Sequence, residues 1–124
     1  MKQENVMYFT EKEEEFVNLL IEIGTKTNVA KVLVFLANTP EAMSHAIERG
    51  TDLRQPEVSL AMRCLMKQGW IKIRENKAKS KGRPVKIYEL VKPITDIMDS
   101  IEKEKKKEAN HQLQLIQKLR NHIR

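Results

Sequence analysis

Apolar residues recur at helical spacing near the start of the chain, within the stretch 10–24. They lie three and four residues apart, at Phe16, Leu19, Leu20 and Ile23. Thr10 lies at the start of this stretch, and Glu13 lies three residues after Thr10, which is the spacing of a capping box. Acidic side chains near Thr10 also favour the start of a helix. Gly24 ends the apolar pattern. The pattern therefore predicts a helix that begins after Thr10 and ends near Gly24.

The segment 27–38, TNVAKVLVFLAN, is apolar on nearly all sides. Such a composition is typical of a short helix that is buried in the centre of a domain. Its β-branched residues leave a buried strand as the alternative. Of the two, we expect the helix.

The next segment, 39–50, carries sequence signals for both ends of a helix. Thr39 suits the N-cap, and Pro40 suits the first helical position because the missing N–H costs nothing there. Gly50 suits the left-handed residue that follows a helix. The inward face is expected to consist of Ala42, Met43, Ala46 and Ile47. Residues 51–55 are expected to form a turn.

A further helix is predicted from Pro56 to Gln68, and Gly69 closes it. Successive residues of a helix turn by about 100°, which separates the side chains of this segment into two faces. The buried face is predicted to comprise Val58, Ala61, Met62 and Leu65. The opposite face is predicted to comprise Ser59, Leu60, Arg63 and Lys67.

Two stretches after this helix alternate apolar with charged residues and are rich in β-forming residues. They are WIKIRE at 70–75 and VKIYELV at 85–91, and they predict the two strands of a hairpin. The loop between them, NKAKSKGRP, contains no large apolar residue. Within it, Pro84 biases Arg83 toward an extended conformation, while Gly82 allows the chain to reverse. We therefore expect Arg83 to project from the tip of the loop.

The segment 93–124 begins with Pro93 and predicts one helix, about 48 Å long at 1.5 Å per residue. An apolar stripe appears twice on it. The first block is Ile94, Ile97, Met98 and Ile101, and the second is Leu115, Ile116, Leu119 and Ile123. Between the blocks, Lys105 and Glu108 occupy the positions that the stripe would take.

The charge of the chain is distributed unevenly. The 124 residues are 40% hydrophobic and 32% charged, which suits a folded protein, and the formal net charge is +6. Residues 1–24 have a net charge of −4, because six Glu outnumber two Lys. Residues 70–92 contain eight basic and two acidic residues, a net charge of +6. A concentrated basic patch of this kind attracts a polyanion.

Several other classes of function find no support in the sequence. Cys64 is the only cysteine, so an intramolecular disulfide is excluded, and we expect it to be a small packing residue. The three histidines are scattered, and no Gly-rich phosphate loop is present, so we expect no metal, no cofactor and no enzymatic activity. No apolar run has the length of a signal peptide or a membrane span, so we expect a cytoplasmic protein.

The order of the predicted elements, three helices followed by a hairpin with a basic loop, is that of a winged helix-turn-helix. The run from AMSHAIERG through PEVSLAMRCLMKQGWIKIRE to KGRPVKIYEL resembles the winged helix-turn-helix transcriptional regulators of bacteria and archaea, of the TrmB, MarR and ArsR type. The shared features are Ala46 and Gly50, the transition LMKQGWI and the strand GRPVKIYEL, and the resemblance covers residues 28–91. Gly50 to Val58 spans eight positions, longer than is usual in the family, which predicts an enlarged turn that carries Arg54 and Gln55.

The resemblance implies a mainly α fold with a small β-hairpin, in which residues 10–92 form a DNA-binding domain. It implies a sequence-specific double-stranded DNA-binding transcriptional regulator, with the helix 56–68 in the major groove and the basic wing 76–84 on the minor groove or backbone. The residues expected to contact DNA are Arg54, Gln55, Ser59, Arg63, Lys67, Lys77, Lys79, Lys81 and Arg83. Leu60 is expected either to touch a thymine methyl group, to contact a partner or to stay exposed.

Residues 93–124 are expected to form a dimerisation helix, because related regulators dimerise through terminal helices. The contact residues of this coiled coil are expected to be Leu115, Ile116, Leu119 and Ile123. A twofold homodimer requires a pseudo-palindromic operator. As an alternative, residues 94–101 pack on the first helix of the same chain, and whether the N-terminal or the C-terminal helix forms the dimer interface stays open.

Two other functions also stay open. Winged helices serve as protein-interaction modules, but the partner would then need carboxylates that match the basic loop. RNA binding is less favoured, because readers of single strands usually expose aromatic side chains for stacking. Four of the six aromatic residues are instead expected in the core, at Phe16, Phe35, Trp70 and Tyr88.

Overall fold

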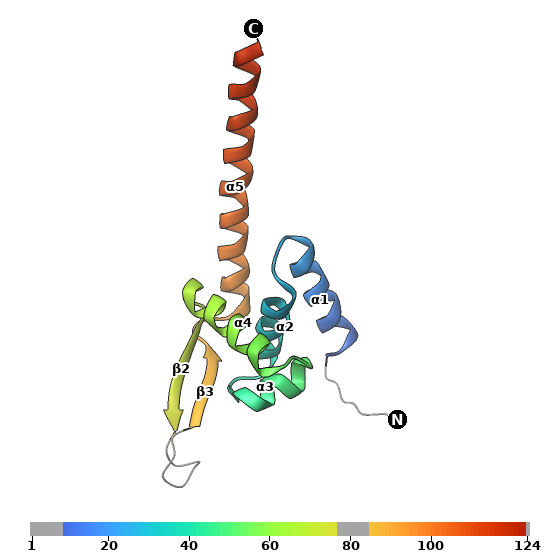
Figure 1. Ribbon diagram of the computed structural model, residues 1–124, viewed down its shortest axis with the longest axis vertical. Helices are drawn as coiled ribbons and strands as arrows, with labels where there is room; N and C mark the ends of the chain where they lie inside the picture. The colour runs from blue at the N-terminus through green and yellow to red at the C-terminus, as the bar shows by residue number, and fades with distance from the viewer. Residues whose placement is uncertain (1–8, 77–84, 124) are drawn as a thin grey trace. The chain divides into compact units, whose positions relative to one another are not determined.

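The computed structural model describes residues 9–76 and 85–123 (Figure 1). The chain divides into two units, Met1–Lys92 and Pro93–Arg124. The helices of the first unit are α1 (Glu11–Glu22), α2 (Thr27–Asn38), α3 (Ser44–Thr51) and α4 (Gln55–Gln68). Its strands are β1 (Ala42–Met43), β2 (Ile71–Asn76) and β3 (Val85–Leu90), and the second unit holds α5 (Ile94–Ile123). The predicted fold class, mainly α with a small β-hairpin, is confirmed.

The start of α1 is fixed by its capping box, as predicted. The Glu13 backbone N–H donates to Thr10 Oγ1 over 3.2 Å, and the Thr10 N–H donates to Glu13 Oε1 over 2.9 Å. These two bonds satisfy backbone donors that have no partner within the helix. Beyond the end of α1, Gly24 has a φ of 111°, a conformation that favours glycine.

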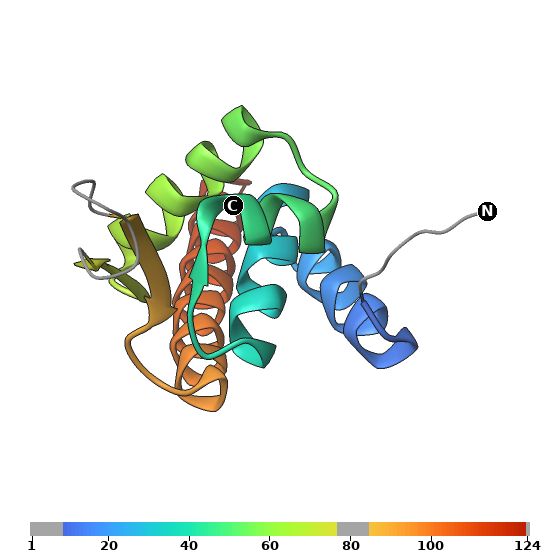
Figure 2. The same cartoon turned by 90° about the horizontal axis from the view of Figure 1, so that it is seen from below.

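Helix α2 forms the centre of the first unit, and the helix prediction for 27–38 is confirmed over the strand. It packs against both α1 and α4 and lies between them (Figure 2). Six of its side chains are buried, at Val29, Ala30, Val32, Leu33, Val34 and Leu36. A helix that is covered on several sides has to be apolar on most of its surface, which explains the composition of this segment.

The prediction that a helix begins at Pro40, with Thr39 as its N-cap, is wrong. Thr39 is extended, with φ −131° and ψ 111°, and the helix α3 begins only at Ser44. Ala42 and Met43 form the short strand β1 instead, which pairs with β3 so that Ala42 lies opposite Tyr88. Pairing with a distant strand thus overrides the local capping signals of this segment.

The predicted role of Gly50 is also wrong, because α3 continues through Gly50 to Thr51. A Cβ atom built on Gly50 would overlap the ring of Phe35 on α2, so this glycine allows two helices to approach closely. The left-handed residue after α3 is Asp52, with a φ of 58°. Residues 52–54 alone connect α3 to α4, so the predicted enlarged turn does not form.

Helix α4 begins at Gln55, one residue before the predicted start, and ends before Gly69, which has a φ of 78°. The Arg54 backbone N–H donates to Glu57 Oε1 over 2.9 Å at the start of this helix. The predicted buried face is confirmed, at Val58, Ala61, Met62 and Leu65. Helix α3, the three residues 52–54 and helix α4 therefore form a helix-turn-helix.

The predicted hairpin is confirmed, and the sheet has the strand order β1-β3-β2. Strands β2 and β3 are antiparallel, with Ile71 opposite Leu90 and Asn76 opposite Val85. The expectation of four aromatic residues in the core is wrong: each of Phe16, Phe35, Trp70 and Tyr88 is only half-buried. The core of the described residues consists of aliphatic side chains and Met62 instead.

The second unit is one continuous helix of 30 residues, α5, as predicted. Ile97 is its buried residue, whereas the side chains of the second apolar block are exposed. The exposed fractions are 44% for Leu115, 45% for Ile116, 65% for Leu119 and 84% for Ile123. Among the described residues, no helix is both long enough and apolar enough to cross a membrane.

Candidate nucleic-acid interface

The outward side of α4 is open, as the sequence predicts. Arg63 and Lys67 are exposed, Leu60 is 54% exposed, and Ser59 is half-buried. Cys64 is exposed too, so its predicted packing role is wrong. Its position lies about 110° around the helix from the centre of the buried face, which is too far for contact with the core.

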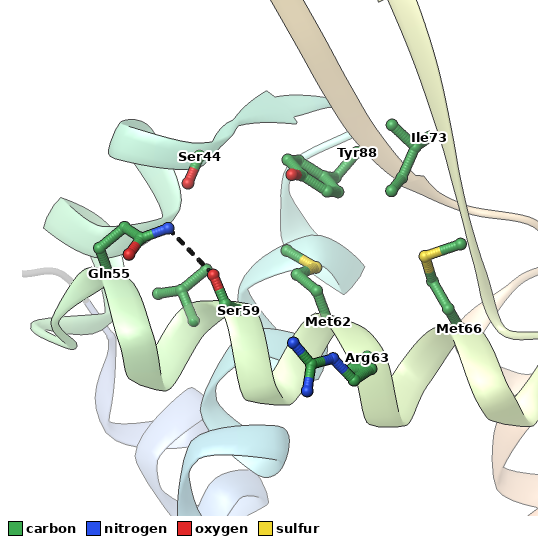
Figure 3. A pocket seen from close by; sticks show the side chains of 9 residues that line it. Ser44, Gln55, Ser59, Met62, Arg63, Met66, Ile73 and Tyr88 are labelled. Atoms are coloured by element: carbon green, nitrogen blue, oxygen red, sulfur yellow. Dashed lines mark hydrogen bonds between the residues drawn. The ribbon is translucent and has the colours of Figure 1, made fainter.

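A shallow pocket lies between α4 and the hairpin (Figure 3). Its volume is about 210 Å³, and its floor is apolar, with Met62 and Met66 from α4 and Ile73 and Tyr88 from the two strands. Its polar lining residues are Ser44, Gln55, Ser59 and Arg63. Helix α4 and the hairpin therefore contribute to the same surface.

Two of these polar side chains hold each other in place. Gln55 Nε2 donates to Ser59 Oγ over 3.0 Å, which orients both side chains on the first turns of α4 (Figure 3). The amide oxygen of Gln55 and the hydroxyl proton of Ser59 stay available for further hydrogen bonds. A glutamine presented in this way has the donor and acceptor pattern that reads adenine in the major groove.

A second pocket, of about 670 Å³, adjoins the start of α3. Its polar lining residues are Gln55 from α4, Ser44, His45 and Glu48 from α3, and Lys86 and Tyr88 from β3. Helix α4 and strand β3 thus meet in one hollow. Lys86 and Glu48 both line this hollow, so one ammonium group and one carboxylate lie near the start of α4.

The basic charge at the base of the hairpin is largely paired. Lys72 Nζ lies 3.5 Å from Glu89 Oε2, and the Arg74 guanidinium lies 2.6 Å from Glu41 and 3.5 Å from Glu89. These exposed pairs add little stability, but they neutralise part of the charge that the sequence concentrates in residues 70–92. The base of the hairpin therefore carries less unpaired positive charge than the count of basic residues in 70–92 indicates.

Four basic residues on or beside α4 make no ion pair within the part of the chain that the structure describes. They are Arg54, Arg63, Lys67 and Lys86, and all four are exposed. Cations without a carboxylate partner lose no existing interaction when they bind a phosphate. The predicted contacts Lys77, Lys79, Lys81 and Arg83 lie outside the described residues, as do Gly82 and Pro84.

Sequence reasoning missed the part of the surface that does not belong to α4. Ser44 and His45 were not predicted as part of the surface, because α3 begins later than its sequence signals indicate. Lys86 and Tyr88 are two residues apart on β3, and the alternation of a strand places both on one face. The spacing of Lys86 and Tyr88 was visible in the sequence, but the sequence did not show that α3 and α4 lie opposite these two residues. Across residues 9–76 and 85–123, no group of three His, Cys, Asp or Glu residues could hold a metal ion.

Comparison with known proteins supports the fold of the chain and does not establish its function. No family model matches the chain, and no curated protein matches its sequence. Among solved structures, a "possible transcriptional regulator" from Methanosarcina mazei Go1 is 16% identical with a TM-score of 0.59, and the match covers 82% of this chain and 86% of that one.

Two further structures resemble the chain less closely. A MarR family transcriptional regulator from Silicibacter pomeroyi is 14% identical, with a TM-score of 0.48 and coverage of 61% of this chain and 49% of that one. A PadR family transcription regulator from Clostridium difficile R20291 is 18% identical, with a TM-score of 0.45 and coverage of 71% and 97%. The element order, the sheet topology and the likeness to the Methanosarcina protein together show that the chain has the winged helix-turn-helix fold.

Proposed function

We propose that the protein is a transcriptional regulator that binds double-stranded DNA in a sequence-specific manner, with α4 in the major groove. The observation that carries this proposal is the surface shared by α4 and β3, where Gln55 and Lys86 line one hollow. Arg54, Arg63 and Lys67, on or beside α4, add exposed cations that make no ion pair within the described residues. An α-helix fits the major groove, and an adjoining strand with a basic residue is then placed to follow the phosphate backbone.

The roles of individual residues follow from their positions on α4. Arg63 and Ser59 face the pocket beside the hairpin, so they are proposed to reach base edges, and Lys67 is proposed to bind a phosphate. Arg54 and Gln55 stand at the start of the helix, which is the end that contacts bases in helix-turn-helix proteins. Leu60 is proposed to touch a thymine methyl group. Lys77, Lys79, Lys81 and Arg83 of the wing 76–84 are proposed from the sequence alone as contacts to the minor groove or backbone.

Two properties of the assembly belong to the same proposal. The exposed stripe Leu115, Ile116, Leu119 and Ile123 on α5 is proposed to hold a homodimer. A twofold dimer would bind two half-sites about one helical turn apart.

The protein is proposed to act without enzymatic activity, and a location in the cytoplasm stays a prediction.

The proposal is tested by selecting bound sequences from random duplexes and then measuring their affinity for single variants. We expect Arg63→Ala to weaken binding to the selected duplex by about ten- to a hundredfold, which is the usual worth of a bidentate base contact. Lys107→Ala on α5 is the matched control, because it removes one exposed cation far along the chain from α4. Equal effects of the two substitutions, or a selection that yields no common sequence, would contradict a specific role for α4.

One observation favours a second function, a protein-interaction module. Leu60 and Met66 on α4 are 54% and 47% exposed, and exposed apolar side chains also serve protein contacts. This alternative predicts that duplex DNA is not bound at low salt, whereas Leu60→Ala weakens binding to a protein partner. Measuring the binding of duplex DNA at low salt therefore separates the two functions.

A further inference from the structure

The side chains of Gln55 and Ser59 form a pair at the start of α4. Residues four positions apart on a helix lie on one face, so the two side chains meet. Gln55 Nε2 donates to Ser59 Oγ over 3.0 Å, and the amide nitrogen of Gln55 turns toward Ser59 (Figure 3). Gln55 is exposed and Ser59 is half-buried, so Gln55 is the more accessible member of the pair. It lines both hollows beside the hairpin.

The hydrogen bond to Ser59 changes what the amide group of Gln55 can recognise. A free glutamine amide has two N–H donors and one carbonyl acceptor. Ser59 takes one of the two donors, which leaves one N–H and the carbonyl oxygen Oε1. Ser44 lines the same pocket, but its hydroxyl donates to Glu48 Oε2 over 3.3 Å, so its proton is not directed at Gln55. The pair therefore presents one donor beside one acceptor.

One donor beside one acceptor is the complement of adenine in the major groove. Adenine offers N7 as an acceptor and its N6 amino group as a donor, whereas guanine offers two acceptors, N7 and O6. A glutamine with both amide protons free can donate to both guanine atoms, but Gln55 has only one proton left to give. Cytosine offers only a donor and thymine only an acceptor beside its methyl group, so each can make one of the two bonds.

We propose that Gln55, held by Ser59, reads one adenine of the bound duplex, with its free Nε2 proton donated to N7 and Oε1 accepting from the N6 amino group. The inference rests on the proposed function and adds to it the base that is selected at this position. Gln55 is the first residue of α4, and the start of the second helix is the part of a helix-turn-helix that meets base edges. Ser59 is a positioning residue for this contact, because it acts through the donors that it leaves to Gln55.

The first experiment compares the four bases at each position of the selected duplex by fluorescence anisotropy at one salt concentration. At one position, adenine should be bound about ten- to a hundredfold more tightly than guanine, which is the usual worth of a bidentate base contact. Gln55→Ala should remove this preference and keep the preferences at the other positions. Because Gln55 is exposed, circular dichroism should report an unchanged fold for this variant.

Base analogues test the two hydrogen bonds one at a time. 7-Deazaadenine has a carbon in place of N7, and unsubstituted purine lacks the N6 amino group. Each analogue should weaken binding to the unchanged chain by about three- to tenfold and should have no further effect on Gln55→Ala. The matched control is 2,6-diaminopurine, which alters the minor-groove edge and keeps both N7 and the N6 amino group.

Ser59→Ala separates the positioning role from a merely structural one. The substitution frees the second amide proton of Gln55, so the ratio of adenine affinity to guanine affinity should fall by about tenfold. Ser59→Thr keeps the hydroxyl and should keep the ratio. The dependence of binding on salt should be the same for all three proteins, because no phosphate contact is lost. Equal weakening for adenine and guanine would show a structural role alone and overturn the positioning role.

Failure of this inference is distinguishable from failure of the proposed function. A specifically bound duplex without an adenine preference, or with one that survives Gln55→Ala, would overturn the inference and leave the function intact. An unchanged ratio of adenine to guanine affinity in Ser59→Ala would show that Ser59 does not set the choice of base. If no duplex is bound at about 50 mM salt, the function fails and the inference fails with it.

Discussion

Gly50→Ala tests how α3 is held against the centre of the fold. Gly50 lies inside α3, where alanine is normally the better residue, so a sequence-based expectation would be a gain in stability. The structure predicts a loss instead, because the added Cβ atom would overlap the Phe35 ring of α2. The outcome therefore distinguishes a glycine that is required for packing from one that merely ends a helix.

The expected size of the effect follows from two opposing terms. Replacing glycine by alanine within a helix stabilises the folded state by about 0.5–1 kcal/mol. Inserting a methyl group into a filled space costs about 1–3 kcal/mol. Phe35 is half-buried, so its ring can move partly aside and the cost should fall in the middle of that range. We expect Gly50→Ala to lower the free energy of unfolding by about 1 kcal/mol.

The assay is urea unfolding of four proteins, the unchanged chain, Gly50→Ala, Phe35→Leu and the double variant. With the smaller side chain at position 35 the clash disappears, so Gly50→Ala should then stabilise the protein by about 0.5–1 kcal/mol. The double-mutant cycle should give a coupling energy of about 1–2 kcal/mol. A Gly50→Ala protein that is more stable than the unchanged chain would refute the close approach of α3 and α2.

Three further predictions concern the start of α1 and the two faces of α4. Met62→Asp should unfold the first unit, because Met62 is 5% exposed and an unpaired buried charge costs several kcal/mol. The control Arg63→Asp should leave the melting temperature nearly unchanged. Equal melting temperatures of the two variants would show that the buried face of α4 is misassigned. Thr10→Ala should cost about 1 kcal/mol in urea unfolding because the capping box is lost, and no change would mean that the box does not form in solution. Replacing thymine by uracil in the selected duplex should weaken binding at one position, and Leu60→Ala should abolish that difference; a difference that persists would exclude Leu60 as the methyl contact.

Signals that act within one or two turns were readable from the sequence. The capping box of Thr10 and Glu13 and the period of the buried face of α4 depend on residues three or four positions apart. Both are present as predicted. The hairpin was readable for the same reason, because its strands alternate residue by residue.

Features that depend on distant segments were not readable. The signals at Thr39 and Pro40 are those of a helix start, yet pairing with β3, more than forty residues later, makes Ala42 and Met43 a strand. Gly50 has the usual properties of a helix end, but its neighbour in space is Phe35 on another helix. The pocket lining at Lys86 was missed because only the packed fold shows which element faces that strand.

The measurement that tests the central claim most directly is the binding of the selected duplex as a function of salt, by fluorescence anisotropy. If α4 and β3 present unpaired cations to DNA, the logarithm of the association constant should fall linearly with the logarithm of salt concentration, by about 0.9 per phosphate contact. Lys67→Ala should reduce that slope by about one contact. No duplex binding at about 50 mM salt, or an affinity independent of salt, would contradict the account.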